Sequence, residues 1–234
     1  MKRACALLIG VLSALLVIPL SAADAGEREL TSRCVFTLPE DSAGNGAARL
    51  TDGSVMTRVR IPGRQSLTVE LPGGATGVYL SWYEAPESAS ITLLDDGGGI
   101  LSTHTSVGLL NEWLPLPSGV SSMEIAAGRQ ATLSDVRVFN VSAAPGWLPL
   151  ANPVPAKTDL LLVAAHAGDE QLDLGGVLPL YAGQRGLRCT VVFCSHRNRQ
   201  ALQDSLYALQ ISGVSTEPVY LNLPDRTYYS APED

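Results

Sequence analysis

The stretch Asp159-Leu-Leu-Leu-Val-Ala-Ala-His-Ala-Gly-Asp-Glu170 decides the fold of the second half of this 234-residue chain. Its apolar run, Leu160 to Ala165, is bounded by polar residues, which predicts a short strand buried on both faces of a parallel sheet. His166, Asp169 and Glu170 follow directly. Ligands bind at the carboxyl ends of such strands, so the pattern places an imidazole and two carboxylates where an open α/β sheet holds a ligand.

The residues around this stretch continue the α/β pattern. Residues 158–234 alternate strand, helix, strand, helix and strand, which predicts βαβ units and a parallel sheet. A helix after Arg199 is indicated by Leu202, Leu206 and Leu209, with Gly213 as its terminal cap. A core of this size is marginal alone, so we expect a truncated Rossmann-like α/β domain, cut off after its third strand.

Ala-His-Ala-Gly-Asp-Glu, at 165–170, resembles the Ala/Pro-His-Pro-Asp-Asp-Glu motif of the LmbE-like (PIG-L) zinc-dependent N-deacetylases. The resemblance spans about residues 157–226. It continues in the paired glycines, the second strand, the helix ending in Gly-Val and the third strand, at 175–176, 189–195, 206–214 and 218–225. It implies a Rossmann-like fold and zinc-dependent hydrolysis of N-acetyl groups on glucosamine-type sugars.

The resemblance also implies roles for individual residues. The His and the second Asp of the family motif hold zinc, and these positions are His166 and Asp169 here. The family's third ligand is a His in a downstream segment that this chain lacks, so His196 is the candidate replacement. The position of the family's general base is Gly168, which leaves Glu170 as the nearest candidate base. Arg199 lies where an Arg of the family contacts substrate.

A structural alternative explains the same residues without a metal. His166 would cap the strand end, and Asp169 would cap the following helix. Glu170 and Asp173 would then be solvated acids of its first turn, and Arg199 a surface residue. Because a catalytic zinc needs three protein ligands, this alternative predicts an impaired or inactive enzyme.

The first half of the chain has a different pattern. Short alternating apolar runs are separated by Gly, Pro, Asp and Ser, which predicts an antiparallel β-sandwich over residues 26–142. The runs are Val55–Ile61, Leu67–Leu71, Val78–Trp82, Ile91–Leu94, Met123–Ile125 and Val136–Val138.

Residues 34–142 also resemble, more faintly, the discoidin-like or galactose-binding (jelly-roll) sandwiches. The matching segments are Ala48–Gly53, Val78–Tyr83, Ile91–Gly97 and Ser134–Phe139. The resemblance implies sugar binding through loops at one end. The side chains that could contact a sugar are Trp82, Tyr83, His104 and Trp113. Trp82 is in phase with Val78 and Leu80, which predicts a core position, whereas Trp113 is the better candidate for an exposed, substrate-binding aromatic.

Two further segments set the organisation of the chain. Residues 1–25 are typical of a signal peptide, with Lys2 and Arg3 before an apolar core. That core is too short to span a membrane, which predicts an exported protein (secreted, periplasmic or at the cell surface) without a stable membrane span after cleavage. Residues 143–157 hold four prolines, which predicts a semi-rigid linker between the two domains.

Composition limits the partners. The formal net charge is −7, which gives no support to a nucleic-acid partner, so we expect a carbohydrate or an N-acetylated amino sugar. Cys189 and Cys194 fall on opposite faces of one expected strand and are predicted to be unpaired, buried thiols. Two functions stay open: an exported LmbE-like deacetylase, impaired or inactive, or a non-catalytic glycan-binding protein that uses its β-sandwich.

Overall fold

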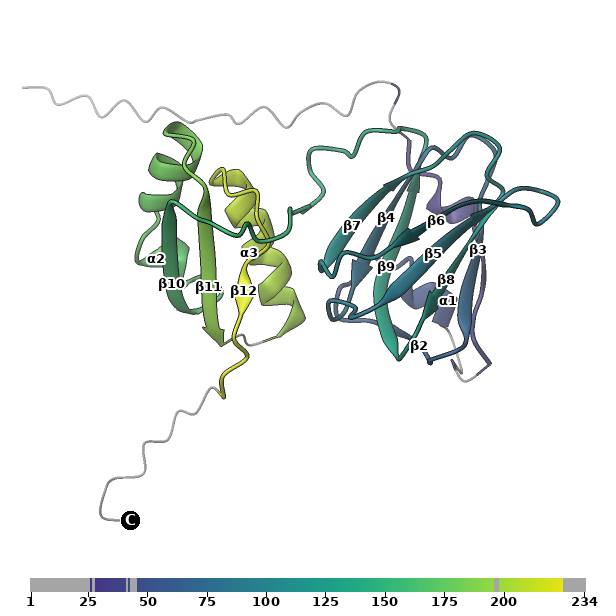
Figure 1. Ribbon diagram of the computed structural model, residues 1–234, viewed down its shortest axis with the longest axis horizontal. Helices are drawn as coiled ribbons and strands as arrows, with labels where there is room; N and C mark the ends of the chain where they lie inside the picture. Colours follow the sequence, from purple (N-terminus) through teal and green to yellow (C-terminus); the bar gives the residue numbers. More distant parts are fainter. Residues whose placement is uncertain (1–25, 27, 41, 43–45, 196–197, 225–234) are drawn as a thin grey trace, which may run out of the picture.

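The computed structural model describes residues 26, 28–40, 42, 46–195 and 198–224, so residues 1–25 of the predicted signal peptide lie outside it. Two antiparallel sheets form a β-sandwich, with a parallel sheet and its helices beside it (Figure 1). The five-stranded sheet runs β1 (Val35–Thr37), β3 (Ser66–Glu70), β8 (Ser122–Ala127), β5 (Ala89–Leu94), β6 (Ile100–Thr105). The four-stranded sheet runs β2 (Val59–Ile61), β9 (Ala131–Phe139), β4 (Gly77–Trp82), β7 (Asn111–Pro115).

The core of the sandwich lies between these two sheets. Alternate residues of β4, namely Val78, Leu80 and Trp82, join one buried cluster with residues of the facing sheet that include Leu67, Ile91, Met123 and Ile125. Period-two alternation directs these side chains inward, so both the predicted antiparallel sandwich and the core position of Trp82 are confirmed.

Strand β4 is buried along its whole length, which is unusual for a strand of a two-layer sandwich. The residues of its outer face are covered by later parts of the chain. Tyr79 packs with Phe139 and Leu148, and Ser81 accepts a hydrogen bond from Arg199. The outer face of β4 is therefore an internal surface.

Some elements differ from the sequence pattern. Strands β6 and β7 lack the regular alternation of buried apolar and exposed polar residues. Strand β6 is largely exposed, and β7 begins with two buried polar residues. The run expected from Val55 forms a strand only over Val59–Ile61, and two short helical segments precede it, η1 (Thr31–Arg33) and α1 (Gly46–Arg49).

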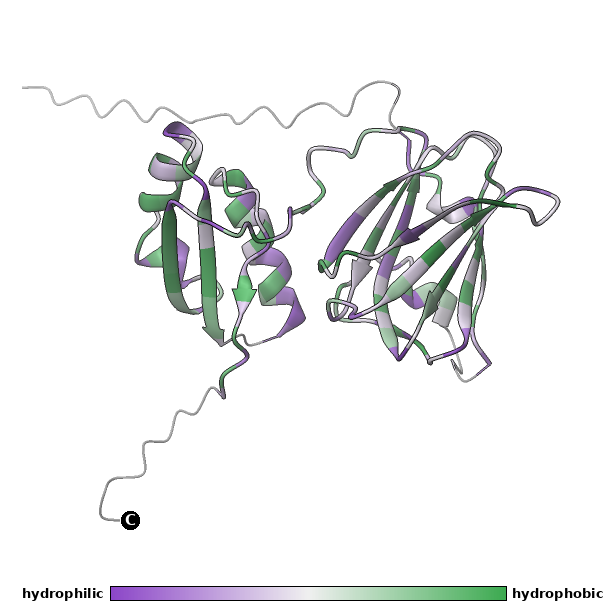
Figure 2. Cartoon of the chain, in the orientation of Figure 1, coloured by the Kyte–Doolittle hydropathy of each residue, from purple (hydrophilic) through white to green (hydrophobic). Residues whose placement is uncertain are grey.

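The second half of the chain forms a parallel sheet in the order β10 (Leu160–His166), β11 (Cys189–Ser195), β12 (Val219–Tyr220). Figure 2 shows β10 and β11 as mainly hydrophobic, the pattern expected of parallel strands. The helical segments are α2 (Asp169–Leu172), the π-helical η2 (Pro179–Gln184) and α3 (Arg199–Ile211). The predicted parallel sheet and the helix after Arg199 are confirmed.

Helix α3 begins and ends as its sequence indicates. The Asn198 side chain accepts a hydrogen bond from the Ala201 amide at 2.9 Å, which caps the N-terminus. Ser212 follows the last turn, and Gly213 adopts a positive φ of 86° beyond it.

Strand β10 is buried on one face only, so its expected burial on both faces is wrong. Leu162 and Ala164 are buried, whereas Leu161 and Val163 are 55% and 58% exposed. Leu178, a helical residue directly before η2, and Leu209 of α3 belong to the cluster of Leu162 and Ala164. The described helices therefore cover that one face.

The described cysteines are unpaired. Cys34, Cys189 and Cys194 are free thiols, of which Cys189 is buried and Cys194 half-buried. Within the described ranges, no helix combines the length and the apolar character that crossing a membrane requires.

Candidate functional site

The predicted metal site lies at the carboxyl end of β10. His166 is the last residue of this strand and Asp169 the first of α2. His166 Nδ1 lies 3.4 Å from Asp169 Oδ2, and the His166 amide donates a hydrogen bond to the same oxygen at 2.9 Å. The two side chains thus lie side by side, and their role as metal ligands stays a prediction. The helix-capping alternative for Asp169 is wrong, because Gly168 holds the cap position and the Asp169 carboxylate points back to the strand.

Glu170 is buried, with 1% of its surface exposed, so the alternative that it is a solvated acid is also wrong. One carboxylate oxygen, Oε2, accepts a hydrogen bond from the Gly168 amide at 2.8 Å. The other has no hydrogen-bond partner among the described residues. Burial raises the pKa of this carboxyl above its usual range. Its role as a base stays a prediction.

The described part of the chain does not by itself fit a catalytic zinc centre. It contains no group of three or more His, Cys, Asp or Glu side chains that could hold a metal ion, and such a centre needs three protein ligands. His166 and Asp169 supply two. His196, the predicted third ligand, lies outside the described residues.

Arg199 connects α3 to the sandwich. It is 3% exposed, and its guanidinium donates to the Trp82 carbonyl at 3.1 Å, Gln203 Oε1 at 3.0 Å, Ser81 Oγ at 3.2 Å and Asn111 Oδ1 at 3.3 Å. The alternative that Arg199 is a surface residue is therefore wrong. Its position as a contact to substrate stays a prediction, because these four bonds are made to the protein itself.

The same network includes three more contacts. Asn111 Nδ2 donates to Gln203 Oε1 at 3.2 Å and to the Pro149 carbonyl at 2.9 Å. Gln203 Nε2 donates to the Tyr79 hydroxyl at 3.4 Å. Polar residues of β4 and β7 are thereby satisfied by α3 and by the segment after β9, as buried polar groups require. This explains why Asn111, the first residue of β7, is buried although it is polar.

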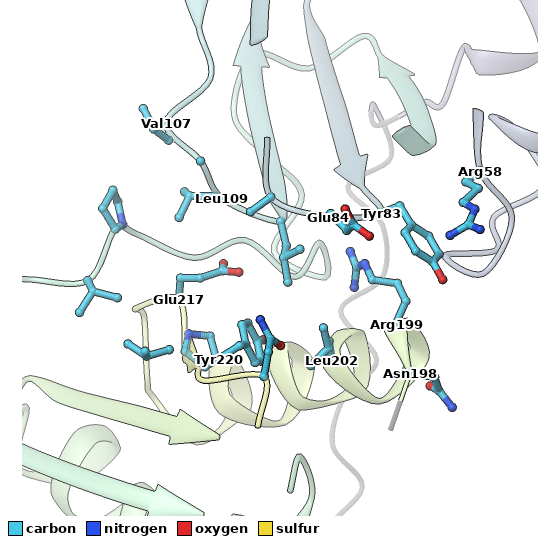
Figure 3. Close-up of a pocket in the computed structure, with 18 residues that line it drawn as sticks. Arg58, Tyr83, Glu84, Val107, Leu109, Asn198, Arg199, Leu202, Glu217 and Tyr220 are labelled. Atoms are coloured by element: carbon cyan, nitrogen blue, oxygen red, sulfur yellow. The ribbon is translucent and has the colours of Figure 1, made fainter. Parts of the chain in front are cut away.

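A cavity of about 870 Å³ lies next to this network, between the sandwich and the parallel-sheet residues. We call it the interface cavity. Figure 3 shows Arg58, Tyr83, Glu84 and Leu109 on its sandwich wall, and Asn198, Arg199, Glu217 and Tyr220 on the opposite wall. Its volume lies within the ~300–1,000 Å³ typical of small-molecule sites.

The charged groups of the interface cavity are unevenly buried. Glu217 is 8% exposed, and burial raises the pKa of its carboxyl to about 7. A hydrogen bond from the Leu110 backbone and the positive charge of Arg199 lower this pKa, but by less than burial raises it. Its Oε2 has no hydrogen-bond partner among the described residues. Burial also raises the pKa of Tyr220 and lowers that of Arg199. On the sandwich wall, the Arg58 guanidinium carbon lies 4.4 Å from the centre of the Tyr83 ring, within cation–π range.

The other aromatic residues considered from the sequence lie outside the interface cavity. Trp113 lies in β7, half-buried, with its ring centroid 5.7 Å from that of Phe139 and its Nε1 donating to the Ser142 carbonyl at 3.1 Å. Its sugar-binding role stays a prediction. His104 Nε2 lies 3.6 Å from Glu112 Oε2.

Sequence reasoning identified Tyr83 and Arg199 but missed Glu217, Tyr220 and Arg58. No local pattern marks Glu217 and Tyr220, because contacts between distant segments bring them to the sandwich residues of the cavity. Arg58 does have a local signal, because it lies on the face of its alternating run that is opposite to the apolar residues.

No protein-family model and no curated protein sequence matches the chain. Solved structures that resemble it include carbohydrate-binding modules and a lectin domain. A Streptococcus pneumoniae fucose binding module is 16% identical over 46% of this chain and 90% of its own, with a TM-score of 0.36. The lectin domain of lectinolysin, complexed with Lewis B antigen, is 14% identical over 46% and 92%, with a TM-score of 0.35.

Chitosan-binding module 1 from a Paenibacillus sp. IK-5 chitosanase/glucanase is 18% identical over 45% of this chain and 92% of its own, with a TM-score of 0.32. The sequence identities and TM-scores of these three structures are too low to assign a ligand or an ancestor to this chain. The LmbE-like resemblance of residues 157–226 receives no support from the comparisons.

Proposed function

We propose that the chain is a carbohydrate-binding protein and that the interface cavity holds the sugar. The observation that carries this proposal is the composition of the cavity walls. The face of a pyranose ring packs on aromatic side chains, and its hydroxyl groups need planar hydrogen-bonding groups around the edge. Tyr83 and Tyr220 supply rings, and Asn198, Glu84 and Glu217 supply polar groups around one space.

The proposal differs from binding by the sandwich alone. One wall of the interface cavity belongs to α3 and to the segment around β12, so a complete site needs both halves of the chain. We propose the corresponding organisation: a signal peptide at 1–25, a galactose-binding-like sandwich at 26–142, a linker at 143–157 and a partial Rossmann-like domain at 158–234. Export to the periplasm, cell surface or medium would give this site access to extracellular glycans.

Replacing Tyr83 with alanine should weaken sugar binding at least tenfold, equivalent to about 1.4 kcal/mol, because the substitution removes one aromatic wall. The measurement is isothermal titration of the purified full chain with tetra-N-acetylchitotetraose and galactotetraose, after a glycan array of neutral and acidic sugars.

Tyr207→Ala is the matched control, since Tyr207 is an exposed tyrosine of α3 outside the interface cavity, and we expect unchanged affinity. A Trp113→Ala variant that loses binding while Tyr83→Ala keeps it would move the sugar to β7 and contradict the proposal. An array without any signal would also contradict it.

A second candidate function rests on the convergence of His166 and Asp169 at the end of β10. We propose it as the zinc site of an LmbE-like amide hydrolase, with His196 as third ligand and Glu170 as base. The substrate would be an N-acetylated amino sugar. Zinc, when bound, would supply a Lewis acid and an activated water.

For this second candidate, zinc titration of the chelator-treated chain should give one bound ion with micromolar affinity. His166→Ala should weaken binding at least tenfold, because a protein ligand is lost, while His104→Ala, at a histidine of the sandwich, should not. A chain that takes up no zinc at micromolar metal, or that binds it equally after His166→Ala, is not such an enzyme.

A further inference from the structure

A second hollow adjoins the interface cavity on the sandwich and is rich in arginine. It has a volume of about 440 Å³ and is lined by residues that include Arg49, Arg58, Arg60, Glu84, Gln130 and Thr132. We call it the arginine cleft. Arg58 and Glu84 line both spaces, so the two hollows adjoin at these residues.

Local structure explains why the arginines gather there. Val59 and Ile61 of β2 are buried in the sandwich core, so the alternating residue Arg60 lies on the outer face, and Arg58 precedes it with the same phase. Arg60 is paired with Thr132 of β9. The Tyr83 amide donates to the Thr132 carbonyl at 2.8 Å, which fixes Tyr83 beside the cleft.

The charge of the cleft is not neutralised within the described structure. Its lining holds three guanidinium groups and one carboxylate, that of Glu84. The described ion pairs of the sandwich involve His104, Arg129 and Arg137. None of them joins an arginine of the cleft to a described carboxylate. In a chain with a net charge of −7, such a local excess of positive charge favours an anionic ligand.

We infer that the sugar recognised by this protein is acidic, and that a carboxylate or sulfate on it binds Arg58 and Arg60. This inference rests on the proposed function. Arg58 lies over the Tyr83 ring at 4.4 Å, so a sugar packed on Tyr83 in the interface cavity would present its substituents to the arginine cleft. A guanidinium binds a carboxylate or sulfate through two parallel hydrogen bonds, which gives the orientation of the sugar as well as affinity.

The test compares matched acidic and neutral sugars. Titration of the full chain with tetragalacturonate and with its methyl ester should show about tenfold tighter binding of the free acid, as expected for charge-assisted hydrogen bonds. Sulfated galactotetraose and galactotetraose form the second pair, which separates sulfate from carboxylate as the source of the charge. Raising NaCl should weaken binding of the acidic members only.

Arg60→Gln should remove most of the preference for the charged member and leave the neutral member unchanged, since Arg60 is absent from the interface cavity. Arg33→Gln changes the net charge equally at an exposed arginine outside the cleft and should have no effect. Equal binding of both members of both pairs would overturn the inference while leaving the proposed function intact. Absence of binding to every sugar would overturn the proposed function as well.

Discussion

Arg199→Ala should lower the free energy of unfolding by about 3 kcal/mol, the largest loss we expect from a single polar side chain here. Its four hydrogen bonds reach β4, β7 and α3. Truncation would leave the Trp82 carbonyl and other acceptors without this donor in a buried interface, and it would also remove the packing of the side-chain stem. The measurement is urea denaturation of the full chain.

Arg188→Ala provides the control. Arg188 forms a two-bond ion pair with Asp159 at 3.1 and 3.2 Å, but its side chain is 60% exposed, and exposed ion pairs contribute little to stability. We therefore expect a much smaller loss. If the two variants lose equal stability, burial of the Arg199 network is not what holds α3 against the sandwich.

Glu217→Gln should stabilise the protein in a pH-dependent manner. Burial raises the pKa of the folded Glu217 carboxyl to about 7 from its ordinary value of 4.5. The unfolded chain therefore releases this proton at lower pH than the folded chain, and the stability of the natural protein falls as pH rises between these two values. The total effect is roughly 3 kcal/mol.

Glutamine keeps the shape of the protonated carboxyl and does not ionise. The variant should therefore match the natural protein at pH 4 and exceed its stability by up to roughly 3 kcal/mol at pH 8. Denaturation of both proteins at a series of pH values measures the difference. A constant difference across this range would contradict the ionisation of Glu217 in a buried position.

The sequence predicted elements whose residues pack on their near neighbours. The alternation of Val78, Leu80 and Trp82 predicted an inward-facing strand, and Gly213 lies beyond the C-terminus of α3 as predicted. The strand β7 was missed because Asn111 is buried and polar. The hydrogen-bond partners of the Asn111 side chain are Ser81, Pro149, Arg199 and Gln203. No local pattern in the sequence identifies partners so far away in the chain.

The candidate site was predicted only in part, for the same reason. His166 and Asp169 are three residues apart, so a short motif sufficed to bring them together. The interface cavity joins Tyr83 to Glu217 and Tyr220, and their proximity depends on how α3 packs on β4. The burial of Glu170 and Arg199 also depends on tertiary packing, so their positions in the sequence do not distinguish a buried from a solvated side chain.

The two-sided burial of β4 limits how this sandwich could be exchanged between proteins during evolution. A domain that is exchanged freely among unrelated enzymes needs a surface on every face that is stable in water. Here Tyr79 and Ser81 on the outer face have partners in α3 or in the segment that follows β9. A gene rearrangement that separated the two halves of the chain would expose the outer face of β4 to water and make it prone to aggregation. Selection should therefore favour inheritance of the two halves as a single unit.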